Sequence, residues 1–190
     1  MLIWQGVGRK QHIGGETPMN NSQRPYTLVI TVLNEPAMLA RIVGIISARG
    51  YNIVSLAVGQ AHSAVYKEES SANGGISRIT LKILADDETI ESVAAHLRRP
   101  IGVLSVEDLT NVSTRVEADL TLVKVMIGHP AAQAIAITLA SSFRALPVIT
   151  ERDYLILRFV GRGDSSRALI EAMSRLGDVE SVTCGAIAIA

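Results

Sequence analysis

Apolar positions in the first half of the chain switch between the periods of strands and helices. Residues 26–33 (YTLVITVL) form a β-branched run, and residues 52–58 and 77–84 alternate apolar with polar positions, so all three are predicted strands. Helical spacing follows the first strand over about 36–49 and recurs from Asp86 or Asp87 to about residue 97, before a fourth strand at 101–109. This βαββαβ order predicts a four-stranded antiparallel sheet with two helices on one face.

The second half repeats this order of elements. It predicts a strand at 120–127, a helix from Pro130 to about Arg144, a hairpin of 148–150 with 154–160, a helix capped by Ser165 or Ser166, and a last strand at 179–189. The predicted fold class is therefore α+β, with two ferredoxin-like βαββαβ modules.

The same pattern sets the predicted domain boundaries. The modules span 26–110 and 118–190, and the short polar segment between them indicates modules in close contact. Residues 1–25 lack periodicity and are predicted to be a disordered extension, with Met19 as a second candidate start of translation.

Charge and cysteine content exclude several classes of protein. The 18 Lys and Arg balance the 18 Asp and Glu, which argues against nucleic-acid binding, and charged residues interrupt every apolar run before it reaches membrane-spanning length. Cys184 is the single cysteine, so no internal disulfide can form. We therefore expect a protein of a reducing compartment, the cytoplasm, that binds no nucleic acid and no membrane.

The sequence contains no pattern typical of a catalytic or metal site. The four histidines are widely separated, and no phosphate-binding glycine loop follows a predicted strand. The turn at residues 33–38 is the best candidate for binding, because free amides at a helix start can hold a carboxylate and Asn34 can add a polar contact. An ordinary helix cap formed by Asn34, with Pro36 in the first turn, explains the same residues.

A longer stretch resembles a known family. Residues 33–59 (LNEPAMLARIVGIISARGYNIVSLAVG) are similar to the opening of the small regulatory subunit of acetohydroxyacid synthase, also called acetolactate synthase, which is an ACT domain. The similarity continues through SRITLKILADDETIESVAAHL (77–97), IGVLSVEDLT (101–110) and VEADLTLVKV (116–125).

The resemblance implies a function without chemistry of its own. It implies a non-catalytic subunit that activates the catalytic large subunit and confers feedback inhibition by valine or another branched-chain amino acid. Thiamine diphosphate, Mg and FAD are then expected on that catalytic partner, with no cofactor in this chain. The alternative is a free-standing ACT-type amino-acid sensor that controls another partner.

The resemblance also implies where an effector binds. In the family, ACT domains pair in a homodimer and the effector lies at their interface, which corresponds here to Asn34, Ala37, Met38, Asn52 and Gly59. The family commonly has glycine where this chain has Ala37, and alanine is restricted where the backbone needs a positive φ. The connection at 60–76 is longer than is usual in the family.

Overall fold

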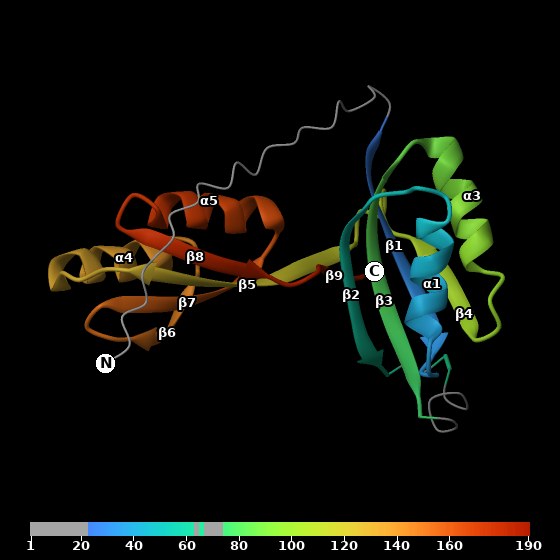
Figure 1. The fold of residues 1–190 in the computed structure, drawn as a ribbon, viewed down its shortest axis with the longest axis horizontal. Coiled ribbons are helices and arrows are strands. Elements are labelled where there is room, and N and C mark those ends of the chain that lie inside the picture. Colours follow the sequence, from blue (N-terminus) through green and yellow to red (C-terminus); the bar gives the residue numbers. More distant parts are fainter. Residues whose placement is uncertain (1–22, 63–64, 67–73) are drawn as a thin grey trace, which may run out of the picture.

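The chain folds into two α+β lobes that are joined through one long strand (Figure 1). The computed structural model describes residues 23–62, 65–66 and 74–190. The elements of the first lobe are β1 (Arg24–Leu33), α1 (Met38–Ser47), β2 (Ile53–Ala61), β3 (Ile76–Ala85), α3 (Asp87–Leu97) and β4 (Val103–Asp108). Those of the second lobe are β5 (Val116–Met126), α4 (Pro130–Ser142), β6 (Leu146–Thr150), β7 (Tyr154–Gly161), α5 (Gly163–Met173), β8 (Asp178–Thr183) and β9 (Ile187–Ile189).

Each lobe contains the predicted antiparallel sheet. The strand order is β2-β3-β1-β4 in the first lobe and β6-β7-β5-β8 in the second, where β9 also pairs with the start of β5. The prediction of an α+β chain with two ferredoxin-like modules is confirmed.

A separate hydrophobic core forms between the sheet and the helices of each lobe. In the first lobe, Leu28 and Ile30 of β1 and Leu81 of β3 pack against Ile42 and Ile46 of α1, and all five are fully buried. Residues two apart on a strand share a face, so the alternate positions of β1 point away from the helices. In the second lobe the corresponding core is built from β5, β7, α4 and α5.

Two predicted helix starts are wrong and two are confirmed, one of which is the start of α4 at Pro130. Asp86 caps α3, since its Oδ1 accepts a hydrogen bond of 2.8 Å from the amide of Thr89. Asn34 does not cap α1, which begins at Met38 with Ala37 as the N-cap residue. Helix α5 begins at Gly163, and Ser166 lies inside it, where its hydroxyl donates to the Gly163 carbonyl oxygen.

Strand boundaries differ from the predictions at two places. Strand β1 begins at Arg24, so the last two residues of the predicted N-terminal extension belong to the sheet, while residues 1–22 of that extension lie outside the described residues. The predicted final strand is two strands, because residues 184–186 leave the second sheet between β8 and β9. In the part of the chain that the structure describes, no helix is long and apolar enough to cross a membrane.

Candidate functional site at the first turn and the domain junction

The turn between β1 and α1 is held in place by the two strands beside β1. The amide of Leu33 donates to the carbonyl oxygen of Gly102 over 2.8 Å, and the amide of Asn34 donates to that of Gly75 over 3.0 Å. Gly102 has a φ of 93°, and a Cβ there would lie 2.4 Å from Cε of Met38. The turn therefore depends on a glycine beside it that allows Met38 to enter the core.

The side chain of Asn34 points across the sheet toward β3. Its Nδ2 donates to the carbonyl oxygen of Gly74, and its Oδ1 accepts from the hydroxyl of Ser77, each over 3.2 Å. The residue is nevertheless exposed at the edge of the turn. Asn34 thus fixes the turn against β3 while its remaining hydrogen-bonding capacity faces outward.

Ala37 adopts the left-handed conformation, with φ 65° and ψ 3°. This conformation brings the Cβ of an L-residue close to backbone oxygen and costs about 1–2 kcal/mol for a residue other than glycine. No side chain caps the helix that follows. The amide of Met38 donates to the carbonyl oxygen of Glu35 over 3.3 Å. The amides of Leu39 and Ala40 are therefore the ones available to an anion, and the helix dipole favours negative charge at this end.

The other predicted effector residues are spread over the first lobe. Met38 is only 3% exposed and belongs to the core, so only its backbone is at the helix start. Gly59 lies on β2 opposite Arg78 of β3, near the end of the sheet that carries the turn. Asn52 precedes β2 at the opposite end of that strand. Within one chain, Asn34 and Ala37 are brought together, while Asn52 is remote from them.

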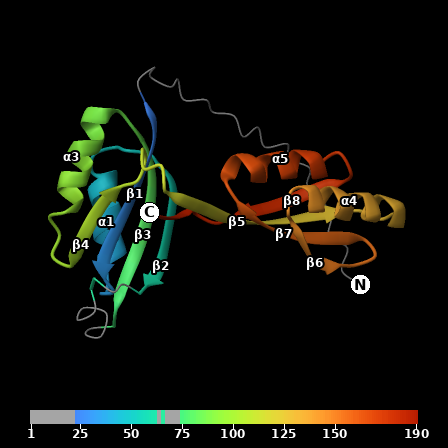
Figure 2. The same cartoon turned by 180° about the vertical axis from the view of Figure 1, so that it is seen from behind.

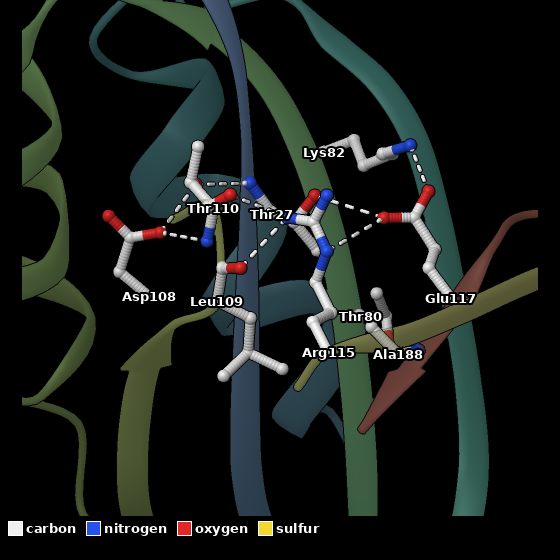
Figure 3. A network of polar contacts seen from close by, with 9 residues as sticks. All are labelled: Thr27, Thr80, Lys82, Asp108, Leu109, Thr110, Arg115, Glu117 and Ala188. Atoms are coloured by element: carbon white, nitrogen blue, oxygen red, sulfur yellow. Dashed lines mark hydrogen bonds and ion pairs between the residues drawn. The ribbon is translucent and has the colours of Figure 1, made fainter. Parts of the chain in front are cut away.

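The domain junction is a second polar site, which the sequence did not single out (Figure 3). Glu117, at the start of β5, is 11% exposed and pairs with Lys82 of β3 and, over 3.6 Å, with Arg115. Arg115 also donates to the carbonyl oxygens of Leu109 and Thr110, at 2.8 and 3.0 Å. The connection between the domains is therefore tied to the first sheet at both of its ends, by contacts of Leu109 and Thr110 with β1 and of Glu117 with β3.

The C-terminal strand β9 lies across the face of the first sheet that carries no helices (Figure 2). The amide of Ala188 donates to Oγ1 of Thr80 over 3.2 Å, and the amide of Ala186 donates to Oγ of Ser55 over 3.1 Å. A Cβ at Gly185 would lie 2.2 Å from the carbonyl oxygen of Leu56. The run CGAIAIA at the C-terminus, which is rich in small residues, is the feature of the sequence that could have indicated this packing. Only small side chains permit such a close approach.

One carboxylate at the junction is half-buried, and one of its oxygens has no partner in the described part of the chain. Oδ1 of Asp119, on β5, is inaccessible and makes no hydrogen bond among the described residues. Burial raises the pKa of Asp119, which the nearby Lys82 ammonium partly offsets and the Glu117 carboxylate reinforces. In the described residues, no group of three His, Cys, Asp or Glu side chains is arranged to hold a metal ion.

Comparison with known proteins matches both lobes. A family model described as the ACT domain of the acetohydroxyacid synthase small subunit matches residues 28–105, and one described as the small subunit of acetolactate synthase matches residues 118–190. The acetolactate synthase small subunit of Aquifex aeolicus is 34% identical over 166 residues, which cover 87% of this chain and 81% of that protein. The Bacillus subtilis small subunit is 32% identical, with 86% and 88% covered.

A solved structure has the same arrangement of both lobes. The crystal structure of the acetolactate synthase small subunit from Thermotoga maritima superposes with a TM-score of 0.72 at 23% sequence identity. The match covers 87% of this chain and 96% of that one. At this identity the likeness establishes the fold.

Replacing Ala37 by glycine tests the strain in the turn. Ala37→Gly removes the cost of about 1–2 kcal/mol of the left-handed conformation but adds about 0.4–1 kcal/mol of backbone entropy to the unfolded chain, so we expect a net gain of up to about 1.6 kcal/mol in unfolding free energy. Urea unfolding measures this. The matched control, Ala40→Gly inside α1, should instead lose about 1 kcal/mol. If both variants lose unfolding free energy, the conformation of Ala37 is not strained.

Because its pKa is raised in the folded protein, Asp119 should make the protein less stable as pH rises. The folded protein holds this proton more tightly than the unfolded chain, so the contribution of Asp119 to stability declines as pH rises from the ordinary aspartate pKa through the raised value. Asp119→Asn should raise the denaturant midpoint at pH 7 relative to wild type and weaken the decline in stability above about pH 4. Urea midpoints between pH 4 and 8 measure this. The exposed control Asp153→Asn should change neither quantity, and an unchanged midpoint in Asp119→Asn would show that burial does not penalise this charge.

Proposed function

Because the chain belongs to the family of acetolactate synthase small subunits, we propose that it is the regulatory subunit of that enzyme. It binds the catalytic large subunit, raises its activity and makes it sensitive to valine or another branched-chain amino acid. Thiamine diphosphate, Mg and FAD belong to the catalytic partner in this proposal, and this chain supplies binding and regulation. The observation that carries the proposal is the agreement with small subunits across both lobes.

Exposed apolar side chains on the second lobe support binding of a partner protein. Helices α4 and α5 cover one face of the second sheet, and the opposite face exposes side chains by 39% to 65% of their area. These are Leu120, Leu122, Met126, Val160 and Val182. Lys124, Arg158 and Glu180 lie among them on the same face, and a surface that mixes exposed apolar and charged side chains is typical of protein interfaces.

The unpaired edge of β2 supports the proposal that the ACT domains form a homodimer. Strand β2 is the last strand on its side of the first sheet, and Val54 and Val58 on it are 53% and 47% exposed. An unpaired edge beside exposed valines favours pairing with a second copy. Two β2 strands related by a two-fold axis run antiparallel and join the sheets side by side.

This pairing also accounts for the separation of Asn34 from Asn52. If the two-fold axis passes between Ser55 and Leu56, Asn52 of one chain lies opposite Gly59 of the partner subunit. Gly59 is near the end of the sheet that carries the turn, so each effector site takes Asn34 from one chain and Asn52 from the other. The amides of α1 then bind the carboxylate of the amino acid, and side-chain oxygens of asparagine accept from its ammonium.

The first experiment measures acetolactate formation by the cognate catalytic subunit. We expect no product from this chain alone, a several-fold increase when it is added, and inhibition as valine is titrated. Asn34→Ala should keep the activation and weaken valine inhibition at least tenfold, because the polar contact at the turn is lost. The matched control Asn111→Ala, in the exposed domain connection, should behave as wild type.

The outcomes separate the alternatives. Absence of activation would favour the free-standing sensor over the regulatory subunit. Product formed by this chain alone would contradict a non-catalytic role. Activation without valine inhibition would retain the subunit and reject valine as its effector, in which case leucine and isoleucine are titrated in the same way.

Mixing two defective variants tests whether the effector site is shared between chains. Asn34→Ala and Asn52→Ala should each weaken valine inhibition when present alone. A dimer containing one of each has one site with both defects and one intact site, so mixed and re-equilibrated chains should recover part of the inhibition. No recovery in mixed dimers, confirmed as mixed by differently tagged chains, would contradict a site formed by Asn34 and Asn52 of different chains.

A further inference from the structure

A cavity of about 430 Å³ lies between the two lobes. One wall is the helix-free face of the first sheet, where Arg78 and Thr80 of β3 lie. The other wall is the junction, with Val116 and Ala118 of β5 beside residues 187–189 of β9. Cavities of this size commonly hold small organic ligands. Both domains contribute to this one, so its shape depends on how they are arranged.

Arg78 is the cation that lines the cavity from the first sheet. Its strand neighbours in register are Gly59 on β2 and Thr31 on β1, both of which lack a charge. Nε of Arg78 is inaccessible and makes no hydrogen bond, and no ion pair joins Arg78 to another of the described residues. The carboxylate of Glu117 is already paired with Lys82 and Arg115.

An unpaired guanidinium group beside a cavity indicates a bound anion. A buried donor without an acceptor costs roughly 1–3 kcal/mol, and more for a charged group, so an anion that supplies the acceptor binds favourably. Arginine presents its donors as a planar fork that matches carboxylate and phosphate oxygens. Thr80 adds a hydroxyl whose oxygen already accepts from Ala188, which leaves its hydrogen free to donate.

The remaining wall selects among anions. Val116, Ala118, Ile187 and Ile189 make the side of the cavity that faces β3 largely apolar. An aliphatic tail is stabilised there by burial, whereas a doubly charged phosphate would leave one charge facing apolar carbon. Gln60 and His62 also line the cavity, and Arg78 is the one described lining residue that carries a permanent charge. One arginine matches a single negative charge, and its guanidinium would repel a ligand ammonium group.

We propose that the cavity between the ACT sheet and the C-terminal strand binds a small aliphatic monocarboxylate, with its carboxylate on Arg78 and its tail against β5 and β9. This site is separate from the turn at residues 33–38, although Gly59, one of the predicted effector residues, also lines the cavity. The proposal does not rest on the proposed regulatory function. A ligand that contacts both walls stabilises the arrangement of the two domains, since it binds only when they are joined.

Calorimetric titration of the full chain with 3-methylbutanoate tests the proposal. We expect saturable binding to the wild-type chain, a loss of at least tenfold in affinity in Arg78→Met, and a smaller loss in Arg78→Lys, which keeps the charge without the fork. Arg152→Met, in the exposed turn between β6 and β7, is the matched control and should bind as wild type. Asn34→Ala should also bind as wild type, which keeps this result independent of the effector turn.

Competition identifies the class of ligand. Inorganic phosphate and valine should each displace 3-methylbutanoate only at concentrations at least tenfold higher than butanoate requires. Absence of binding at 10 mM ligand, unchanged affinity in both Arg78 variants, or an equal loss in Arg152→Met would overturn the site. Displacement by phosphate or valine as effective as that by butanoate would overturn the assignment to an aliphatic monocarboxylate.

Discussion

Burial of the first sheet on both faces is the constraint on which the two-domain arrangement depends. Every residue of β1 from Tyr26 to Val32 is buried, which helices on one face alone cannot achieve. The second cover comes from the junction, where Val29, Leu109 and Ala188 form a small buried cluster. Because this cover consists of the domain connection and the last strand of the chain, the first sheet is completed only when the second domain has folded behind it.

Local patterns predicted the elements well, since each records burial against a near neighbour in sequence. The β-branched run at residues 27–33 of β1, in which threonine is the only polar residue type, differs from the alternation of β2, and such a run is consistent with a strand buried on both faces. The pattern does not say what covers the second face. The answer is a strand more than 150 residues away in sequence, which carries only small and β-branched side chains and whose close approach depends on Gly185.

Sequence reasoning about the candidate site failed where a tertiary contact decided the local structure. Asn34 has the chemistry of a helix cap, yet its side chain bonds across the sheet to Gly74 and Ser77. The helix therefore starts three residues later than a cap at Asn34 would give, after Ala37 in a left-handed conformation. The sequence showed that residue 37 is alanine where the family commonly has glycine. Only the folded turn shows the positive φ of Ala37, which makes alanine strained there.

Strand β3 connects the turn with the junction over a short distance. The hydroxyl of Ser77 on β3 donates to Oδ1 of Asn34, and Oγ1 of Thr80, three residues along, accepts from the amide of Ala188 in the C-terminal strand. Ser77 points to the helix side and Thr80 to the junction side, so a displacement of β3 along its axis changes both contacts together. Arg78 lies between these two residues with its guanidinium at the junction cavity. Contacts at the turn and at the junction are thus made by one strand, and any ligand that shifts this strand from either side acts on both.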